Sequence, residues 1–447
     1  MVQGPMLIVI LVAAIILIVL LTAKAKLHPF VTLLIVAYGV GIASGLPAKD
    51  IISAITGGFG STLGSIGIVI ACGTIIGFLL EKSGAALVMA NTILRIVGEA
   101  RSALAMGITG AVVSIPVFCD SGFVILSPLN RSLAERSEKS LAVFAVALSM
   151  GLYSTHVFVP PTPGPIAAAG NLSADLGTVI LLGLLVSIPT VIAGYIYANY
   201  MGSKIHIEPK PEATFDEITK TFGRLPSVGR SFAPLLTPVV LIALKSVADY
   251  PSKPLGAGSF AALLSFLGHP VTALLIGVFL AFFTFPKITE DVRGSWVNEG
   301  IKNAGIIILI TGAGGALGSV LRATPIASYL GESLSALKMG VFVPFIVAAA
   351  LKTAQGSSTV SLITTSALMA PLLPALGLAS PMGAALTVLA IGAGSMTVSH
   401  ANDSYFWVVA QLSDMDVTQA YKLQTVGSLV TGIVGIIVVF VLSLFLA

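Results

Sequence analysis

Charged residues are scarce in this chain. Only 9% of its 447 residues are Asp, Glu, Lys or Arg, whereas 56% are hydrophobic, and soluble domains contain roughly 25% charged residues. This balance excludes an ordinary soluble domain and predicts an integral membrane protein in contact with a lipid bilayer. The net charge is +4, and its basic residues are scattered over loops, so no nucleic-acid-binding surface is expected.

Residues typical of redox, metal and nucleotide sites are also few or absent. The two cysteines, Cys72 and Cys119, lie in apolar or glycine-rich surroundings and do not indicate a disulfide framework. No HExxH pattern, P-loop or GxSxG element occurs. We therefore expect no metal and no cofactor, and an ATPase is excluded. The apolar run 6–21 lacks a charged n-region and is expected to be a first span rather than a cleaved signal.

Apolar runs occupy most of the chain. Because a crossing needs about 20 apolar residues, spans are predicted at 6–22, 30–46, 61–80, 103–118, 141–158, 177–200, 232–248, 269–285, 303–320, 341–353, 383–398 and 426–446. The longest hydrophilic segment separates them into two groups of six. The predicted organisation is an N-terminal transmembrane repeat (1–202), a polar linker (203–230) and a C-terminal transmembrane repeat (231–447).

Two segments, 119–133 and 355–374, look too short or too polar to cross, and each is predicted to be a re-entrant helical hairpin. Each half has a second polar interruption further on, at 154–165 and 395–404. Corresponding interruptions in two halves are typical of secondary transporters with inverted repeats. The predicted fold is therefore an all-α polytopic membrane protein of about twelve spans, in two inverted-topology repeats that each contain a hairpin and an interrupted helix.

The segment QGSSTVSLITTS, 355–366, carries an unusual density of hydroxyls between apolar runs. A helix that ends inside the protein can present its free N–H groups to an anion. We expect Gly356, Ser357, Ser358 and Thr359 to meet a substrate carboxylate there, with Lys352 supplying positive charge. The alternative is that these hydroxyls only join helix to helix by hydrogen bonds.

In the first half, the run 160–165 reads PPTPGP and cannot form a continuous helix, because proline removes amide donors. Thr162 and Gly164 are candidate substrate-binding residues in this break, and His156, one turn upstream, is a candidate proton carrier. A proline kink used only for packing is the alternative.

Asp120 lies between the apolar runs SIPVFC and GFVIL. A carboxylate within a membrane is a functional candidate by default, and apolar surroundings favour its neutral form. Asp120 is therefore ranked first as the proton carrier, with Ser121 and Gly122 beside it as anion-binding residues. The alternative is a solvated loop at the end of a span.

Three polar residues, His400, Asn402 and Asp403, directly follow the helical run LAIGAGSMTVS. At helical spacing His400 and Asp403 share a face. We expect His400 and Asn402 to bind substrate hydroxyls and Asp403 to serve in proton coupling. A buried pair that satisfies its own hydrogen bonds is the alternative.

Five ordered motifs, GGFGSTLGSIG (57–67), PPTPGP, ITGAGGALGSVL (310–321), QGSSTV and SHANDSYFW, resemble the gluconate:proton symporter family. The resemblance covers nearly the whole chain. It implies a multi-pass carrier of the bacterial inner membrane that imports gluconate or a related sugar acid, or, in one branch, D-serine. Where other members have a Glu and PPHPGP, this chain has Asp120 and PPTPGP. These departures point to a different small hydroxy acid, such as glycerate.

The expected function is therefore proton-driven symport of a small hydroxylated monocarboxylate. The proton rests on the resemblance, and sodium coupling stays open, as does a homo-oligomeric assembly. An intramembrane hydrolase using Ser357 or Ser358 with His400 or His156, and a passive channel, are the rival interpretations.

Overall fold

The computed structural model describes residues 2–98, 101–209, 222–249, 258–326 and 339–446, together with Gly256 and Tyr329. Regular structure in these residues is entirely helical, as predicted. Positions 210–221 of the predicted linker 203–230 lie outside the described residues, so the predicted division into two repeats and a linker stays a prediction.

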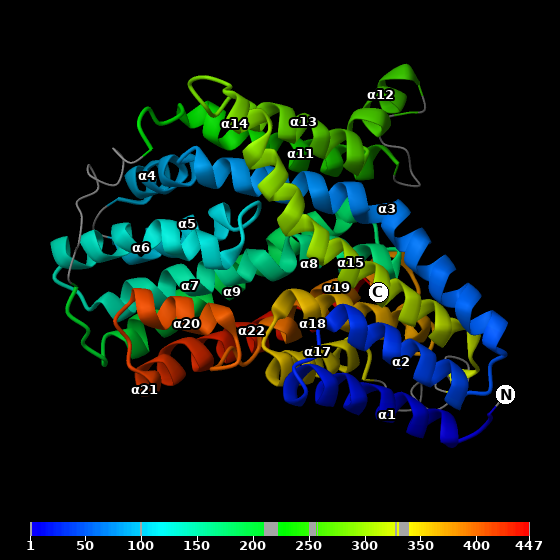
Figure 1. Ribbon diagram of the computed structural model, residues 1–447. Helices are drawn as coiled ribbons and strands as arrows, with labels where there is room; N and C mark the ends of the chain where they lie inside the picture. Colours follow the sequence, from blue (N-terminus) through cyan, green and yellow to red (C-terminus); the bar gives the residue numbers. More distant parts are fainter. Residues whose placement is uncertain are drawn as a thin grey trace.

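Figure 1 shows the helices in chain order. Those before the linker are α1 (Met6–Val19), α2 (Pro29–Ala43), α3 (Ala48–Lys82), α4 (Ala85–Val97), α5 (Ser102–Val113), α6 (Cys119–Arg136), α7 (Leu141–Phe158), α8 (Pro163–Leu172) and α9 (Leu176–Gly202). Those after it are α11 (Val228–Ala248), α12 (Ser259–Leu267), α13 (Pro270–Phe282), α14 (Glu290–Arg293), α15 (Ser295–Ala323), α17 (Phe342–Gln355), α18 (Ser358–Met369), α19 (Pro381–Met396), α20 (Ser404–Leu412), α21 (Val417–Ala420) and α22 (Val426–Leu446).

Six helical segments among the described residues are long and apolar enough to cross a membrane, or seven if the bent pair α12–α13 forms one span. Six of the predicted spans fall on helices shorter than 18 residues. These are α1, α2, α5, α13, α17 and α19, which have 14, 15, 12, 13, 14 and 16 residues. The predicted number of twelve crossings is therefore not confirmed by helix length and composition, and α4 and α12 were not foreseen.

Both predicted hairpin segments are helices that follow a break. Helix α6 begins at Cys119 after the break 114–118, and α18 begins at Ser358 after the break at Gly356 and Ser357. The Ser361 hydroxyl donates to the Ala348 carbonyl of α17 at 2.8 Å, so α18 turns back along α17. The predicted segment 355–374 is thus the second arm of a hairpin, and α17, taken as a span in the sequence, is its first arm.

Both predicted interruptions are breaks between helices. Residues 159–162 separate α7 from α8 and contain a cis bond between Pro160 and Pro161. Residues 397–403 separate α19 from α20. The order helix, break, helix occurs for α5–α6 and α7–α8 and again for α17–α18 and α19–α20. This order agrees with the predicted repeats, whose inverted topology stays a prediction.

The two longest helices, α3 and α15, pack closely because small residues line their contact. A Cβ atom on Gly58 would overlap the Ser319 hydroxyl and lie within 2.5 Å of the Gly315 carbonyl, and one on Gly315 would overlap the Thr62 hydroxyl. Figure 1 shows α15 crossing the bundle beside α3. The glycine-rich motifs 57–67 and 310–321 thus form one helix–helix contact.

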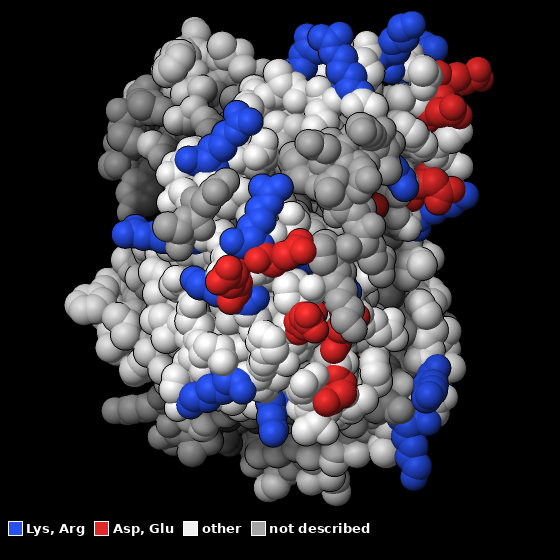
Figure 2. Space-filling view, turned by 90° about the vertical axis from the view of Figure 1, so that its left-hand side faces the viewer, with Lys and Arg blue, Asp and Glu red and all other residues white. Residues whose placement is uncertain are grey.

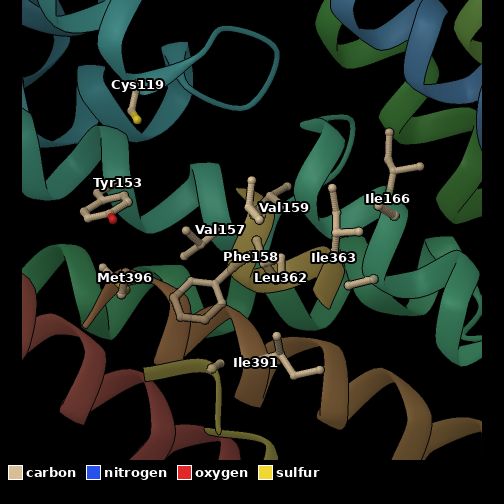
Figure 3. Packing of buried hydrophobic residues seen from close by; sticks show 14 of the residues in the cluster. Cys119, Tyr153, Val157, Phe158, Val159, Ile166, Leu362, Ile363, Ile391 and Met396 are labelled. Atoms are coloured by element: carbon tan, nitrogen blue, oxygen red, sulfur yellow. The ribbon is translucent and has the colours of Figure 1, made fainter. Parts of the chain in front are cut away.

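The centre of the molecule is a continuous apolar core, in which Leu362 and Ile363 of α18 lie near Val159 and Ile166 (Figure 3). The surface is different. Figure 2 shows one face on which basic and acidic side chains are scattered among uncharged ones.

Candidate functional site

The breaks are held against α3 by two glycines that lie one turn apart. A Cβ atom on Gly73 would lie 2.7 Å from the Pro161 carbonyl oxygen, and one on Gly77 would overlap the Pro116 carbonyl oxygen. Only glycine permits such an approach of backbone to backbone. Helix α3 therefore brings together the break before α6 and the break before α8.

Helices α8 and α18 run side by side from these breaks. Near their beginnings, a Cβ atom on Gly164 would lie 2.7 Å from the Leu362 side chain and 3.7 Å from the Thr359 Cα. Toward their ends, the Asn171 amide donates to Ser366 Oγ at 3.0 Å. Because the beginnings and the ends pair with each other, the two helices are parallel. Their N-termini, which carry partial positive charge, meet at the breaks.

Lys352 lies in the last turn of α17 and is fully buried. Its Nζ donates to the Gly356 carbonyl and to Asp403 Oδ2, the latter at 2.5 Å. It also lies 5.8 Å from the centre of the Tyr153 ring. A buried ammonium needs a counter-charge and hydrogen-bond partners. The site predicted around Lys352 therefore contains an ion pair between α17 and the start of α20.

Asp403 also caps α20. Its Oδ1 accepts from the Tyr405 amide at 3.1 Å, and its Oδ2 accepts a further hydrogen bond from Ser399 Oγ at 2.5 Å. The Ser399 amide in turn donates to Ser428 Oγ at 2.9 Å. The carboxylate is thus fixed by Lys352 of α17, by Ser399 within the break 397–403 and by the first turn of α20.

Gly356 has a φ of +85°, and a Cβ atom there would overlap the Asn402 carbonyl oxygen. The sequence-based reason for this glycine was the close approach of an anion. The structure gives another reason, because the tip of the α17–α18 hairpin rests on the backbone of Asn402 and Asp403. The positive φ further favours glycine.

His400 and Asn402 bind the same backbone atom. His400 Nε2 and Asn402 Nδ2 each lie 2.8 Å from the Thr353 carbonyl oxygen, one of the last carbonyls of α17, which have no partner within their own helix. Residues 397–403 form no helix, so the argument that His400 and Asp403 share a helical face was wrong. Asp403 faces Lys352, and His400 faces Thr353.

Asp120 lies in the first turn of α6, close to the start of α20. Its Oδ1 accepts from Ser404 Oγ at 3.3 Å, and the Cys119 thiol lies 3.7 Å from Oδ2. Asp120 and Asp403 interact electrostatically, so two carboxylates from different halves face the same helix start. Neighbouring Ser121 interacts with Glu81 of α3, and Gly122 packs against Leu152.

His156 and Tyr153 lie on the last turns of α7 and are buried. Among the described residues, His156 Nδ1 has no hydrogen-bond partner, and its ring lies 6.0 Å from that of Phe118. His156 interacts electrostatically with Lys352 and Asp403, and the buried Tyr153 hydroxyl has no hydrogen-bond partner among the described residues. Figure 3 shows Tyr153 near Cys119.

Other residues that were predicted to bind substrate bond to the backbone or pack between helices. The Thr162 hydroxyl donates to the Val159 carbonyl at 2.7 Å, and Ser357 caps α18 by accepting from the Val360 amide at 3.3 Å. Thr359 and Gly164 lie at the contact of α18 with α8. These residues shape the helix starts. The polar cluster consists of the buried Cys119, Tyr153, His156, Lys352, Ser358, Ser399 and Asp403, with the half-buried Asp120 and the exposed Ser404 at its edge.

Sequence reasoning did not select Tyr153, Ser399 or Ser404. Two signals were available, because Tyr153 precedes His156 by one helical turn and Ser399 and Ser404 flank the set 400–403. Ser404 bonds to Asp120, which is remote in the chain, and Ser399 reaches Asp403 across a break that is not helical, so their roles became visible only in three dimensions.

Several known proteins resemble this chain over nearly its whole length. A family model described as "GntP family permease" matches residues 6–445. A gluconate permease of Pseudomonas aeruginosa is 35% identical, with 98% of this chain and 97% of the relative covered. The D-serine transporter DsdX of Escherichia coli is 32% identical, with 97% of both chains covered.

Two solved structures share the fold. The YdaH transporter of Alcanivorax borkumensis has a TM-score of 0.67 at 13% identity, with 93% of this chain and 98% of that chain covered. MtrF of Neisseria gonorrhoeae has a TM-score of 0.68 at 14% identity, with 96% and 97% covered.

Proposed function

Since the chain belongs to the GntP family of permeases, we propose that it is a secondary transporter that carries a small hydroxylated monocarboxylate together with a proton across the inner membrane. As a permease it is a transporter and not an enzyme. Gluconate is the first candidate substrate, because it is named for the Pseudomonas aeruginosa relative. Glycerate and D-serine are carboxylates with a hydroxyl close by and are the next candidates.

The observation that carries this proposal is the buried ion pair between Lys352 and Asp403. Lys352 is the buried cation nearest the paired starts of α8 and α18, where helix dipoles also favour an anion. A substrate carboxylate competes with the Asp403 carboxylate for this ammonium. Substrate binding therefore requires that Asp403 either becomes neutral or moves away from Lys352.

Proton uptake by Asp403 meets this requirement. With Lys352 positive and Asp403 negative, the empty site has no net charge. With Lys352 positive, Asp403 protonated and one monocarboxylate bound, the loaded site again has none. Each half-loaded state contains one unbalanced charge, which is expensive to bury within a membrane. One proton and one monocarboxylate are thus coupled because Lys352, Asp403 and their ligands are together neutral only in the empty and the doubly loaded states, with the charge of Asp120 the same in both.

In this proposal the proton carrier is Asp403 and not Asp120. The titratable groups that interact with Asp403 come from four helices and are Cys119, Asp120, Tyr153, His156, Lys352 and Tyr405. Among these groups, only Lys352 forms an ion pair with Asp403. Asp120 instead binds Ser404, so its protonation does not free the ammonium.

Substrate hydroxyls have partners close to this pair in Ser358, His400 and Asn402, which we propose as the residues that distinguish one hydroxy acid from another. His400 and Asn402 share the Thr353 carbonyl, so either can turn to a ligand while the other keeps that contact. The hydrolase alternative loses support from the same contacts, because Ser357 caps α18 and His400 faces Thr353.

The test is uptake of labelled gluconate, glycerate and D-serine into proteoliposomes of the purified protein. An inward proton gradient is expected to drive accumulation of at least one of them above the external concentration. A sodium gradient at constant pH is expected to drive none. Accumulation driven by a sodium gradient alone would show that sodium is the coupled ion in place of the proton. Equilibration without accumulation would show that the protein is a passive channel.

A further inference from the structure

A polar cavity of about 450 Å³ lies at the other ends of α8 and α18, away from the breaks. It lies between these ends, the middle part of α3 and the C-terminal part of α15. Its polar lining residues are Ser61, Thr62, Ser65, Asn171, Ser173 and Arg322. Ser61, Ser65, Ser173 and Arg322 are exposed, so the cavity opens to the surface.

The cavity accounts for the two glycine-rich motifs in a way that helix packing alone does not. Gly315 touches Thr62 across the α3–α15 contact. Gly315 also lines the cavity, together with Gly314 and Gly318, which lie on the side that faces α18. A Cβ atom on Gly318 would lie 3.1 Å from the Ala367 carbonyl oxygen and 3.8 Å from Arg322 Nη2. Because Gly318 has no side chain, the Arg322 guanidinium can lie against it at the wall of the cavity.

Arg322 is the charged group among the described residues of this lining, and these include no carboxylate. Among the described residues its guanidinium donates one hydrogen bond, to Ser319 Oγ at 3.3 Å, and it forms no ion pair. A guanidinium has five N–H donors in a planar fork that matches a carboxylate. Arg322 thus brings positive charge and free donors to a cavity whose described lining holds no anion.

Asn171 supplies the complementary group. Its Nδ2 donates to the Ile363 carbonyl at 3.3 Å and to Ser366 Oγ at 3.0 Å. Because a backbone carbonyl only accepts, the atom that faces it must be the amide nitrogen, which fixes the orientation of the side chain. Among the described residues, the Oδ1 atom is buried and has no partner. A buried acceptor of this kind is suited to a ligand hydroxyl.

We propose that this cavity is a second binding site for the transported hydroxy acid, with Arg322 on the carboxylate and Asn171 Oδ1 on a hydroxyl. The inference rests on the proposed function for the identity of the ligand. The ten residues of α8 and the twelve of α18 separate the cavity from the breaks by about 15–18 Å at 1.5 Å per residue. The cavity is therefore a vestibule, which the substrate occupies on its way to or from Lys352.

The helix dipoles make Arg322 essential to such a site. The C-terminal ends of α8, α15 and α18 meet at the cavity and carry partial negative charge, which disfavours an anion. Arg322 must overcome this charge as well as attract the carboxylate. The preference of the cavity for anions is consequently expected to depend on this one side chain.

Thiol labelling tests this dependence without requiring transport. Ser65 is exposed at the cavity, and Cys72 and Cys119 are buried. In Ser65→Cys protein, the rates of reaction with anionic sulfonatoethyl and cationic trimethylammonioethyl methanethiosulfonate are compared. Adding Arg322→Gln is expected to lower the anionic-to-cationic rate ratio by about fivefold or more, whereas Arg322→Lys keeps most of it. Gluconate is expected to slow both reactions in the Ser65→Cys protein, and this protection is lost with Asn171→Leu.

Arg293→Gln in the Ser65→Cys protein is the matched control, because Arg293 is an exposed arginine outside the cavity. It is expected to leave the rate ratio unchanged. An Arg322→Gln protein with an unchanged ratio, or a Ser65→Cys protein that gluconate, glycerate and D-serine all fail to protect, overturns the proposal. These results differ from failure of the proposed function, which is the absence of gradient-driven uptake in the unmodified protein.

Discussion

Lys352 and Asp403 are 51 positions apart in the chain, yet their side chains form a 2.5 Å ion pair in the interior of the protein. One belongs to the end of a hairpin arm and the other begins the helix after a break. The pair therefore joins the two interrupted elements of the second half. The contribution of this ion pair to protein stability and its role in proton coupling can be measured separately.

Lys352→Met is expected to lower the free energy of unfolding by about 3–5 kcal/mol, because it leaves the Asp403 carboxylate buried without a counter-charge. Adding Asp403→Asn removes that charge and keeps a residue suited to the cap of α20, so the double variant is expected to recover most of the loss. Denaturant unfolding in detergent measures both. The control is Lys302→Met, which breaks an exposed pair with Glu299 and is expected to cost at most about 1 kcal/mol.

Asp403→Asn is expected to separate binding from proton coupling. In the wild-type protein, affinity for the carboxylate falls as pH rises, by up to about tenfold per pH unit, because one proton must bind with the substrate. In the Asp403→Asn protein Lys352 is permanently available, so affinity becomes independent of pH while exchange continues and accumulation stops. Equilibrium binding and proteoliposome uptake measure the two effects.

Asp120→Asn is the comparison for this prediction. It keeps the bond to Ser404 and is expected to retain pH-dependent affinity and accumulation. If Asp120→Asn loses accumulation and Asp403→Asn keeps it, the order of the two carboxylates is reversed.

Gly356→Ala is expected to destabilise the hairpin tip. The substitution forces alanine into a left-handed conformation, at about 1–2 kcal/mol, and drives its Cβ into the Asn402 carbonyl. Gly377→Ala separates these effects, since Gly377 has a φ of +70° and no atom within 4 Å of a Cβ. Gly356→Ala should therefore lose clearly more unfolding free energy than Gly377→Ala. Equal losses would mean that the contact with Asn402 is not rigid.

The predicted inverted topology can be tested by labelling from each side of the membrane. Glu138 follows α6 and Ala379 follows α18, and both are exposed. Corresponding positions of inverted repeats lie on opposite faces, so Glu138→Cys and Ala379→Cys are expected to react with an impermeant thiol reagent from opposite sides. Reaction of both from the same side would exclude inverted repeats.

The helix breaks could be predicted from the sequence because their causes are local. Prolines at 160–165 remove amide donors, and polar residues at 355–359 and 395–404 interrupt apolar runs. All three positions are breaks in the structure. The same local signal failed to separate spans from hairpin arms, because α5 and α17 are as apolar as a crossing helix and only their length and packing differ.

The partners of the site residues could not be predicted in this way. Lys352 was selected for its charge, but its bond to Asp403 depends on how a hairpin packs on a break far along the chain. The same packing gave Gly356 a neighbour in Asn402 instead of open space for an anion. The spacing of His400 and Asp403 was misleading, because it assumed a helix where the chain is extended and turned.

The glycines of α3 have a mechanical consequence. Gly73 and Gly77 lie one turn apart on a single helix, and each receives a proline carbonyl from a different interruption of the first half. Because both carbonyls rest on the same helix, α3 fixes their spacing along its axis. A displacement of α3 relative to Pro116 therefore also changes the contact of Gly73 with Pro161, so the two interruptions are mechanically coupled through this helix.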